Sequence, residues 1–120
     1  MANQIGETRV HMYEVGGAAA RKITARVTIG EGQRGGWAAF LDDKLLEKGS
    51  GPKVLGLGEA AALRGRQLLI NSVVIDVRPE TNRLSVTTRI KGGRKELLAR
   101  HKNVGDDGAT ANYVTVVLFI

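Results

Sequence analysis

The sequence predicts an all-β fold, a small single-domain antiparallel β-sandwich of roughly seven to nine short strands spanning residues 1–120. Three observations lead to this prediction. Polar and apolar residues alternate along 22–29 and 83–91, β-branched apolar runs recur, and glycine clusters cut the chain into short pieces. A small β-barrel is the alternative architecture, and one short helix is compatible with either.

The length and the cysteine content limit what can hold the fold together. A chain of 120 residues has the usual size of one domain and can bury a core without covalent help. It contains no cysteine, which excludes disulfides and any zinc site built on thiolates.

The first half of the chain contains one clear strand and several ambiguous pieces. Thr8 to Val15 is a plausible first strand, and Lys22 to Ile29 is the clearest, with apolar residues at every second position. Residues 37–48 form either a hairpin that turns at Asp42-Asp43 or a short helix, and we favour the hairpin. Residues 57–69 contain three consecutive alanines between glycines, which leaves strand and helix both open.

The second half predicts a long hairpin over residues 67–91. Gln67 to Val77 is apolar on both faces, which indicates a strand covered on both sides. Residues 78–82 combine Pro and Asn as in a turn, and Arg83 to Lys91 alternates again. Glu96 to Val104 is a weaker strand, and Tyr113 to Ile120 follows the turn at 105–108 as a strand in the core.

Two glycine motifs resemble phosphate-binding loops without meeting their requirements. Residues 30–35 match Gly-x-Gly-x-x-Gly after a strand, but residues 50–57 lack the acidic residue that would bind the ribose. Residues 92–95 lack the spacing of a P-loop. We therefore predict a flexible loop and a glycine turn at these places, and no nucleotide or other cofactor.

The remaining polar groups do not predict an enzyme. His11 and His101 have no second metal ligand at suitable spacing, so surface positions and no metal site are expected. The pairs Asp42-Asp43 and Asp106-Asp107 stand where turns are expected, and neighbouring strand residues point to opposite faces. No Ser-His-Asp or Cys-His set can be assembled, which predicts a protein without enzymatic activity.

The strongest functional signal is a block of positive charge. Residues 64–102 carry ten basic and three acidic side chains, a net charge of +7, in a chain whose total is +6. Such a block attracts phosphates or an acidic protein surface, although plain solvation is the simplest interpretation. Because Trp37, Phe40 and Phe119 are expected in the core, few rings remain for stacking on bases. The candidate basic binding face comprises Lys22, Arg26, Arg64, Arg66, Arg83, Arg89, Lys91, Arg94 and Lys95.

These observations favour a non-enzymatic protein–protein interaction or assembly module that acts through strand edges and a basic face, on a protein partner or on copies of itself. The alternative is a nucleic-acid-binding small β-barrel that uses residues 64–102. A small-ligand pocket ranks last, and no small-molecule substrate is evident. Residues 1–10 lack the features of a secretion signal, and the apolar run 116–120 is far too short to span a membrane, so we expect a cytoplasmic protein.

Overall fold

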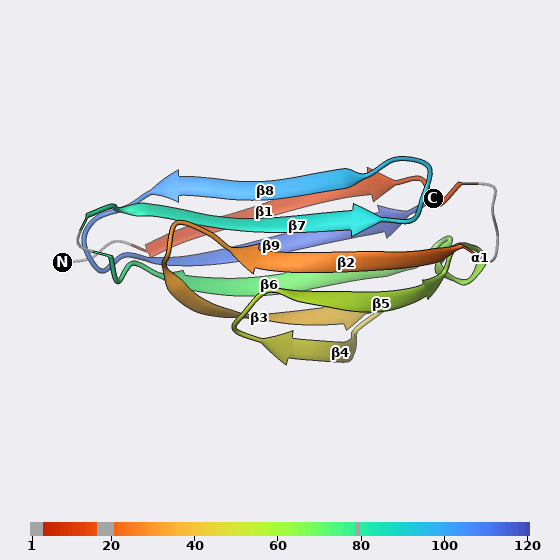
Figure 1. Cartoon of the computed structure of the whole chain (residues 1–120), viewed down its shortest axis with the longest axis horizontal. Coiled ribbons are helices and arrows are strands. Elements are labelled where there is room, and N and C mark those ends of the chain that lie inside the picture. Colours follow the sequence, from red (N-terminus) through yellow and green to blue (C-terminus); the bar gives the residue numbers. More distant parts are fainter. Residues whose placement is uncertain (1–3, 17–20, 79) are drawn as a thin grey trace.

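The computed structural model describes residues 4–16, 21–78 and 80–120. It contains two β-sheets that pack face to face, with the strands running along the long axis of the molecule (Figure 1). In chain order the elements are β1 (Gln4–Tyr13), β2 (Lys22–Ile29), β3 (Arg34–Leu41), β4 (Lys44–Gly49), β5 (Lys53–Glu59), α1 (Ala60–Leu63), β6 (Gln67–Ile75), β7 (Arg83–Lys91), β8 (Leu97–Val104) and β9 (Thr110–Phe119).

The strand order confirms the predicted sandwich. One sheet has five strands in the order β1-β9-β6-β3-β4, and the other has four in the order β5-β2-β7-β8. Both sheets end in edge strands within the part of the chain that the structure describes, so the barrel alternative is wrong. The pairing is antiparallel throughout except between β1 and β9, which run parallel from Gln4↔Thr110 to Tyr13↔Phe119.

The predicted hairpin over residues 67–91 is wrong, although both of its strands exist. β6 pairs with β3 and β9 in one sheet, whereas β7 pairs with β2 and β8 in the other. The segment between them therefore crosses from one layer to the other. Alternation shows which side of a strand is apolar, but it does not identify the neighbouring strand.

One buried amide holds this crossover in place. Gln33 Nε2 donates to Asp76 Oδ1 at 3.0 Å, and its Oε1 accepts from the backbone N–H groups of Val77 and Arg78 at 2.8 and 3.1 Å. Gln33 belongs to the glycine motif at residues 30–35, where Glu31 and Gly32 have positive φ values of 61° and 69°. The motif is thus a tight turn anchored to the crossover, not the flexible loop that we expected.

The two ambiguous stretches are now assigned. Residues 37–48 form the hairpin of β3 and β4, and Asp42 and Asp43 turn it with φ values of 48° and 67°. Residues 57–69 contain the end of β5, the single turn of α1 and the start of β6. None of the helices in the described residues is long and apolar enough to cross a membrane.

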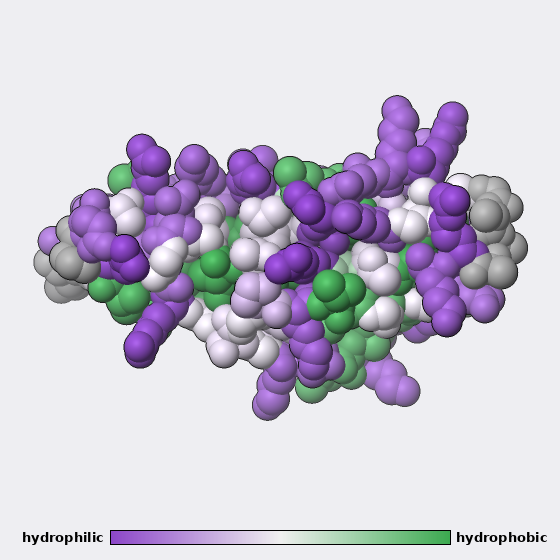
Figure 2. All heavy atoms as spheres, in the orientation of Figure 1, coloured by the Kyte–Doolittle hydropathy of each residue, from purple (hydrophilic) through white to green (hydrophobic). Residues whose placement is uncertain are grey.

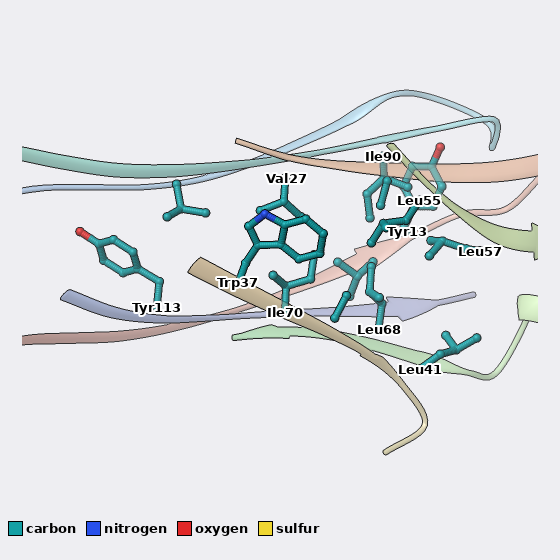
Figure 3. Close-up of a cluster of buried hydrophobic side chains, with 14 of the residues drawn as sticks. Tyr13, Val27, Trp37, Leu41, Leu55, Leu57, Leu68, Ile70, Ile90 and Tyr113 are labelled. Carbon is teal, nitrogen blue, oxygen red and sulfur yellow. The ribbon is translucent and has the colours of Figure 1, made fainter. Parts of the chain in front are cut away.

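The core lies between the two sheets. Trp37 is buried there between Val27 of the four-stranded sheet and Ile70 of the five-stranded sheet (Figure 3). Its indole N–H donates to the carbonyl of Gly51 at 3.0 Å, which satisfies its polar atom. β6 and β9 alternate between buried and more accessible residues, so only one side of each strand is covered. The prediction that residues 67–77 form a strand covered on both sides is therefore wrong.

Candidate functional site

The outer side of the four-stranded sheet is cationic. Alternation in β2, β7 and β8 turns the basic side chains away from the core, and the register places them in adjacent rows. This cationic face comprises Lys22, Arg26, Arg83, Arg89, Lys91, Arg100 and Lys102, all exposed. Figure 2 looks onto this side of the molecule, where hydrophilic groups project among pale, weakly polar residues and some hydrophobic ones.

Arg26 and Arg89 stand at the centre of the cationic face. They are direct cross-strand partners in the β2–β7 ladder, an arrangement that costs stability because like charges face each other. Arg89 Nε is 2.8 Å from Glu96 Oε1, which neutralises part of this charge. A shallow depression between the two arginines is lined by Thr28 and Thr87.

The nine predicted basic residues fall into two groups. Lys22, Arg26, Arg83, Arg89 and Lys91 lie together on the cationic face, as the predicted strands 22–29 and 83–91 require. Four others, Arg64, Arg66, Arg94 and Lys95, lie instead in the connections beside α1 and between β7 and β8. They therefore belong to one end of the sandwich and not to the sheet surface.

These end residues are mostly engaged locally. Arg66 Nε contacts Asp42 Oδ2 at 2.6 Å, and Arg94 contacts Glu14 at 2.8 Å. The Arg66 hydrogen bond, with one from the Gln67 backbone, lowers the pKa of Asp42 and stabilises the β3–β4 turn. Arg64 donates to the carbonyl of Gly16 at 3.0 Å. Arg21, Arg64 and Arg94 line an open hollow at this end, together with Glu14.

The outer side of the five-stranded sheet has the opposite character. Reading the register across all five strands gives Val10 on β1, Val116 on β9, Leu69 on β6, Phe40 on β3 and Leu45 on β4. We call these five residues the apolar row. Val10 is 60% exposed and Leu45 49%, and none of the five belongs to the hydrophobic core between the sheets. Phe40 was expected in the core, so that expectation is wrong.

The surroundings of the apolar row are also poor in charge. On one side Met12 and Leu118 extend it next to Gln67, and on the other side the exposed Asn71 lies between Val114 and Ala38. At the outward positions of the five strands that the structure describes, the charged residues are Arg34 and Lys48, near the margins of the sheet. A monomer rarely leaves a contiguous apolar patch of this kind open to water.

The strand edges are tied together across the layers. Glu7 on β1 contacts His101 on β8 at 2.7 Å, and Glu47 on β4 contacts Lys53 on β5 at 2.7 Å. Each pair joins the edge of one sheet to the edge of the other. Charged groups at sheet edges also oppose pairing with a further strand, which makes these edges poor docking sites.

His101 is buried, contrary to the surface position expected for it. Only 1% of it is exposed, and its ring stacks on Tyr113 with centroids 4.6 Å apart. Because the Glu7 carboxylate can only accept, Nδ1 donates to it, and Nε2 forms a hydrogen bond with the Thr115 hydroxyl at 3.0 Å. Burial, followed by the charge of Glu7, raises the pKa of Tyr113 to about 12.

The order Glu7–His101–Thr115 matches the connectivity of a carboxylate–histidine–hydroxyl triad. Its members come from three strands that are adjacent only in space, so the sequence alone does not reveal the set. The Thr115 hydroxyl would have to be the nucleophile, yet Thr115 is only 1% exposed. A substrate cannot reach it there, so the chain of hydrogen bonds serves to join β1, β8 and β9.

The sequence missed two parts of these surfaces. Arg100 and Lys102 alternate along β8, but that strand had only a weak pattern and they were left out of the basic face. The apolar row is not visible in the sequence because its residues come from five strands. The one sequence feature that points to it is the apolar character of residues 67–77 on both sides of the strand. Within the described residues, no group of three or more His, Asp or Glu side chains could hold a metal ion.

Comparison with known proteins leaves the surfaces themselves as the basis for inferring function. No protein-family model, curated protein or solved structure matches this chain.

Proposed function

We propose that this protein is a non-enzymatic assembly module, which binds other protein chains through the outer faces of its two sheets. The observation that supports this best is the apolar row, which crosses all five strands of one sheet and is covered by no other strand or helix of residues 4–16, 21–78 and 80–120. β-Sheets are stable when both of their apolar sides are covered. The chain supplies one cover, and a bound protein would supply the other.

The apolar area of this face determines how much free energy binding can gain. Burying apolar surface contributes roughly 25 cal/mol per Å², so a few hundred Å² of this face would contribute several kcal/mol to binding. Val10 and Leu45 would lose the largest fraction of water-exposed surface on binding, because they are the most exposed members of the apolar row. The same surface gives no benefit to a monomer in water, where it promotes aggregation.

The faces support docking better than the edges do. β8 carries Arg100 and Lys102, β4 is short and has a register shift, and β5 contains two glycines. All three features weaken pairing with an added strand. We therefore assign the contact to side chains on the sheet faces, with the main-chain edges in a minor role.

The cationic face supports a second contact of different chemistry. Arg26 and Arg89 remain opposite each other at a cost in stability, which an acidic partner surface would relieve. Nucleic acid is supported less well, because the outward positions of β2, β5, β7 and β8 carry no aromatic ring that could stack on a base. An acidic protein surface is the partner class that this face favours.

A site-specific photo-crosslink tests the proposal. A photoreactive phenylalanine analogue replaces Leu69, at the centre of the apolar row, and in a matched variant it replaces Thr87, on the outer face of the other sheet. After irradiation in the producing cells, mass spectrometry identifies what each variant has captured. We expect a discrete protein adduct from position 69, either with another copy or with a second protein.

The absence of any protein adduct at position 69, in a protein that circular dichroism shows to be folded, would contradict the proposal. Adducts of equal yield and identity at positions 69 and 87 would also contradict it, because they would reflect random collision.

A further inference from the structure

We infer that the occupant of the apolar row is a second copy of this chain, packed sheet against sheet to form a symmetric dimer. This inference rests on the proposed function and names its partner. The resulting complex would have four layers of β-sheet, with the two cationic faces on the outside. The arrangement of the apolar row, its low charge and its size each support this occupant.

The apolar row is centred on the middle strand. In the order β1-β9-β6-β3-β4, Leu69 lies on β6, with two apolar residues on either side of it. A twofold axis in the plane of the interface through Leu69 can run along the row or across it. In the first case each residue meets its own copy, and in the second Val116 meets Phe40 and Val10 meets Leu45. Either way every contact within the row is apolar, which is the self-complementarity that the centre of a twofold interface needs.

The charge distribution also selects this face for self-association. A symmetric interface brings identical groups together, so a strongly charged face repels its own copy. The cationic face has Arg26 and Arg89 at its centre and cannot pair with itself. The outward positions of the five-stranded sheet that the structure describes carry only Arg34 and Lys48, both away from Leu69. Of the two outer faces, this one alone tolerates a second copy.

The size of the face meets the requirement of a stable dimer. The molecule measures 49 × 23 × 20 Å, with the strands along the longest dimension. An interface of standard size buries roughly 800 Å² on each partner, equivalent to a patch of about 23 by 35 Å. Such a patch fits on the outer side of the five-stranded sheet. The packing would repeat the face-to-face contact that the chain already makes between its own layers.

Sedimentation velocity over a concentration series tests the inference. We expect the native chain to sediment as a dimer, and the double variant Val10→Lys/Leu45→Lys as a monomer, because it places cations at both ends of the row. The dissociation constant of the dimer should rise at least about 100-fold. The matched control is Val54→Lys, since Val54 is 58% exposed on the outer side of the other sheet. This control should remain dimeric.

A second variant, Leu69→Thr, adds no charge and suits a strand, and it should also weaken the dimer. Circular dichroism and thermal melting serve as controls that each variant is folded. A native chain that stays monomeric up to its solubility limit would overturn the inference. If position 69 still captured another protein, the proposed function would survive, and if it captured nothing, both would fail. A dimer that Val54→Lys disrupts and Val10→Lys/Leu45→Lys does not would place the interface elsewhere and overturn the inference.

Discussion

Two ionisable groups on edge strand β1, Glu7 and His11, have lowered pKa values. Glu7 contacts His101. His11 lies four residues after Glu7 on β1, and its Nε2 atom is buried without a hydrogen-bond partner. Burial lowers the pKa of His11, and Coulombic interactions with His101 and Arg9 add to the effect. The hydrogen bond from Arg9 is the main reason why the pKa of Glu7 is lowered, against an opposing effect of burial.

Acid should therefore destabilise the protein in two separate windows. In the unfolded chain, His11 is protonated near its ordinary pKa of 6.5. In the folded protein its pKa is lower, so protonation requires a lower pH. Between these values the unfolded state binds more protons, so the free energy of unfolding decreases as the pH falls. Glu7 adds a further loss below its ordinary value of 4.5.

We predict that His11→Gln flattens the decrease in unfolding free energy as the pH falls through 6.5 and below, because it removes a group with a lowered pKa. Urea titrations across this range measure the effect. The difference between the two proteins reports on His11 together with its Coulombic interaction with His101. Parallel curves for the native chain and the variant would contradict the assignment.

Single residues also show where sequence reasoning stops. The turn at Asp42-Asp43 was predicted because its chemistry is local. The burial of His101 was not, because its partner Glu7 is 94 residues away and on another sheet. The same holds for Gln33, whose hydrogen bonds reach residues more than 40 positions later. Nothing in the local pattern distinguishes these side chains from surface ones.

At the level of the element, close contact between strands decides which glycines are needed. A Cβ atom on Gly35 of β3 would lie 2.0 Å from the carbonyl oxygen of Val73 on β6, and that backbone atom cannot move aside easily. Gly56 on β5 has nothing within 4 Å of the same position. Both residues sit in strands, so a substitution compares a crowded site with an open one.

We predict that Gly35→Ala lowers the free energy of unfolding by roughly 2–4 kcal/mol, because it forces β3 away from β6. The control Gly56→Ala should change it by less than about 1 kcal/mol, in the stabilising direction, since alanine restricts the unfolded chain. Chemical denaturation of the two variants gives the comparison. Equal effects would show that crowding at Gly35 is not the cause.

The elements themselves were largely predictable, whereas their pairing was not. Strands 22–29 and 83–91 have the predicted bounds because alternation follows directly from burial of one side. The pairing of β6 depends on contacts with β3 and β9, which one sequence does not reveal. Because strand pairing cannot be read from one sequence, the apolar row could not be predicted either. Its five members are neighbours only in the strand order β1-β9-β6-β3-β4.

Across the whole molecule, the two outer faces differ in charge, and this difference should be measurable in the isolated protein. The chain carries a net charge of +6, and Arg26 faces Arg89 across the β2–β7 ladder. Arg34 is also an exposed arginine in a strand, but its partner across the β3–β6 ladder is Ile75. The two positions allow the cost of the facing arginines to be separated from the cost of net charge.

We predict that Arg26→Thr raises the free energy of unfolding by roughly 0.2–1 kcal/mol at low salt, because it relieves the cross-strand repulsion. Arg34→Thr removes the same charge and should have a smaller effect. At about 1 M salt the advantage of Arg26→Thr should disappear, since screening then acts over roughly 3 Å. Thermal melts at both salt concentrations measure this, and a gain that persists at high salt would point to a packing effect instead.

The parallel pairing of β1 with β9 has a consequence for how the chain reaches its native state. The partners Gln4 and Thr110 are 106 residues apart, and β9 lies between β1 and β6 in the sheet. A topology dominated by such distant contacts folds slowly, typically over milliseconds to seconds. Until β9 arrives, one side of β6 has no hydrogen-bonding partner, so refolding yield should decline at high protein concentration as nascent chains capture one another.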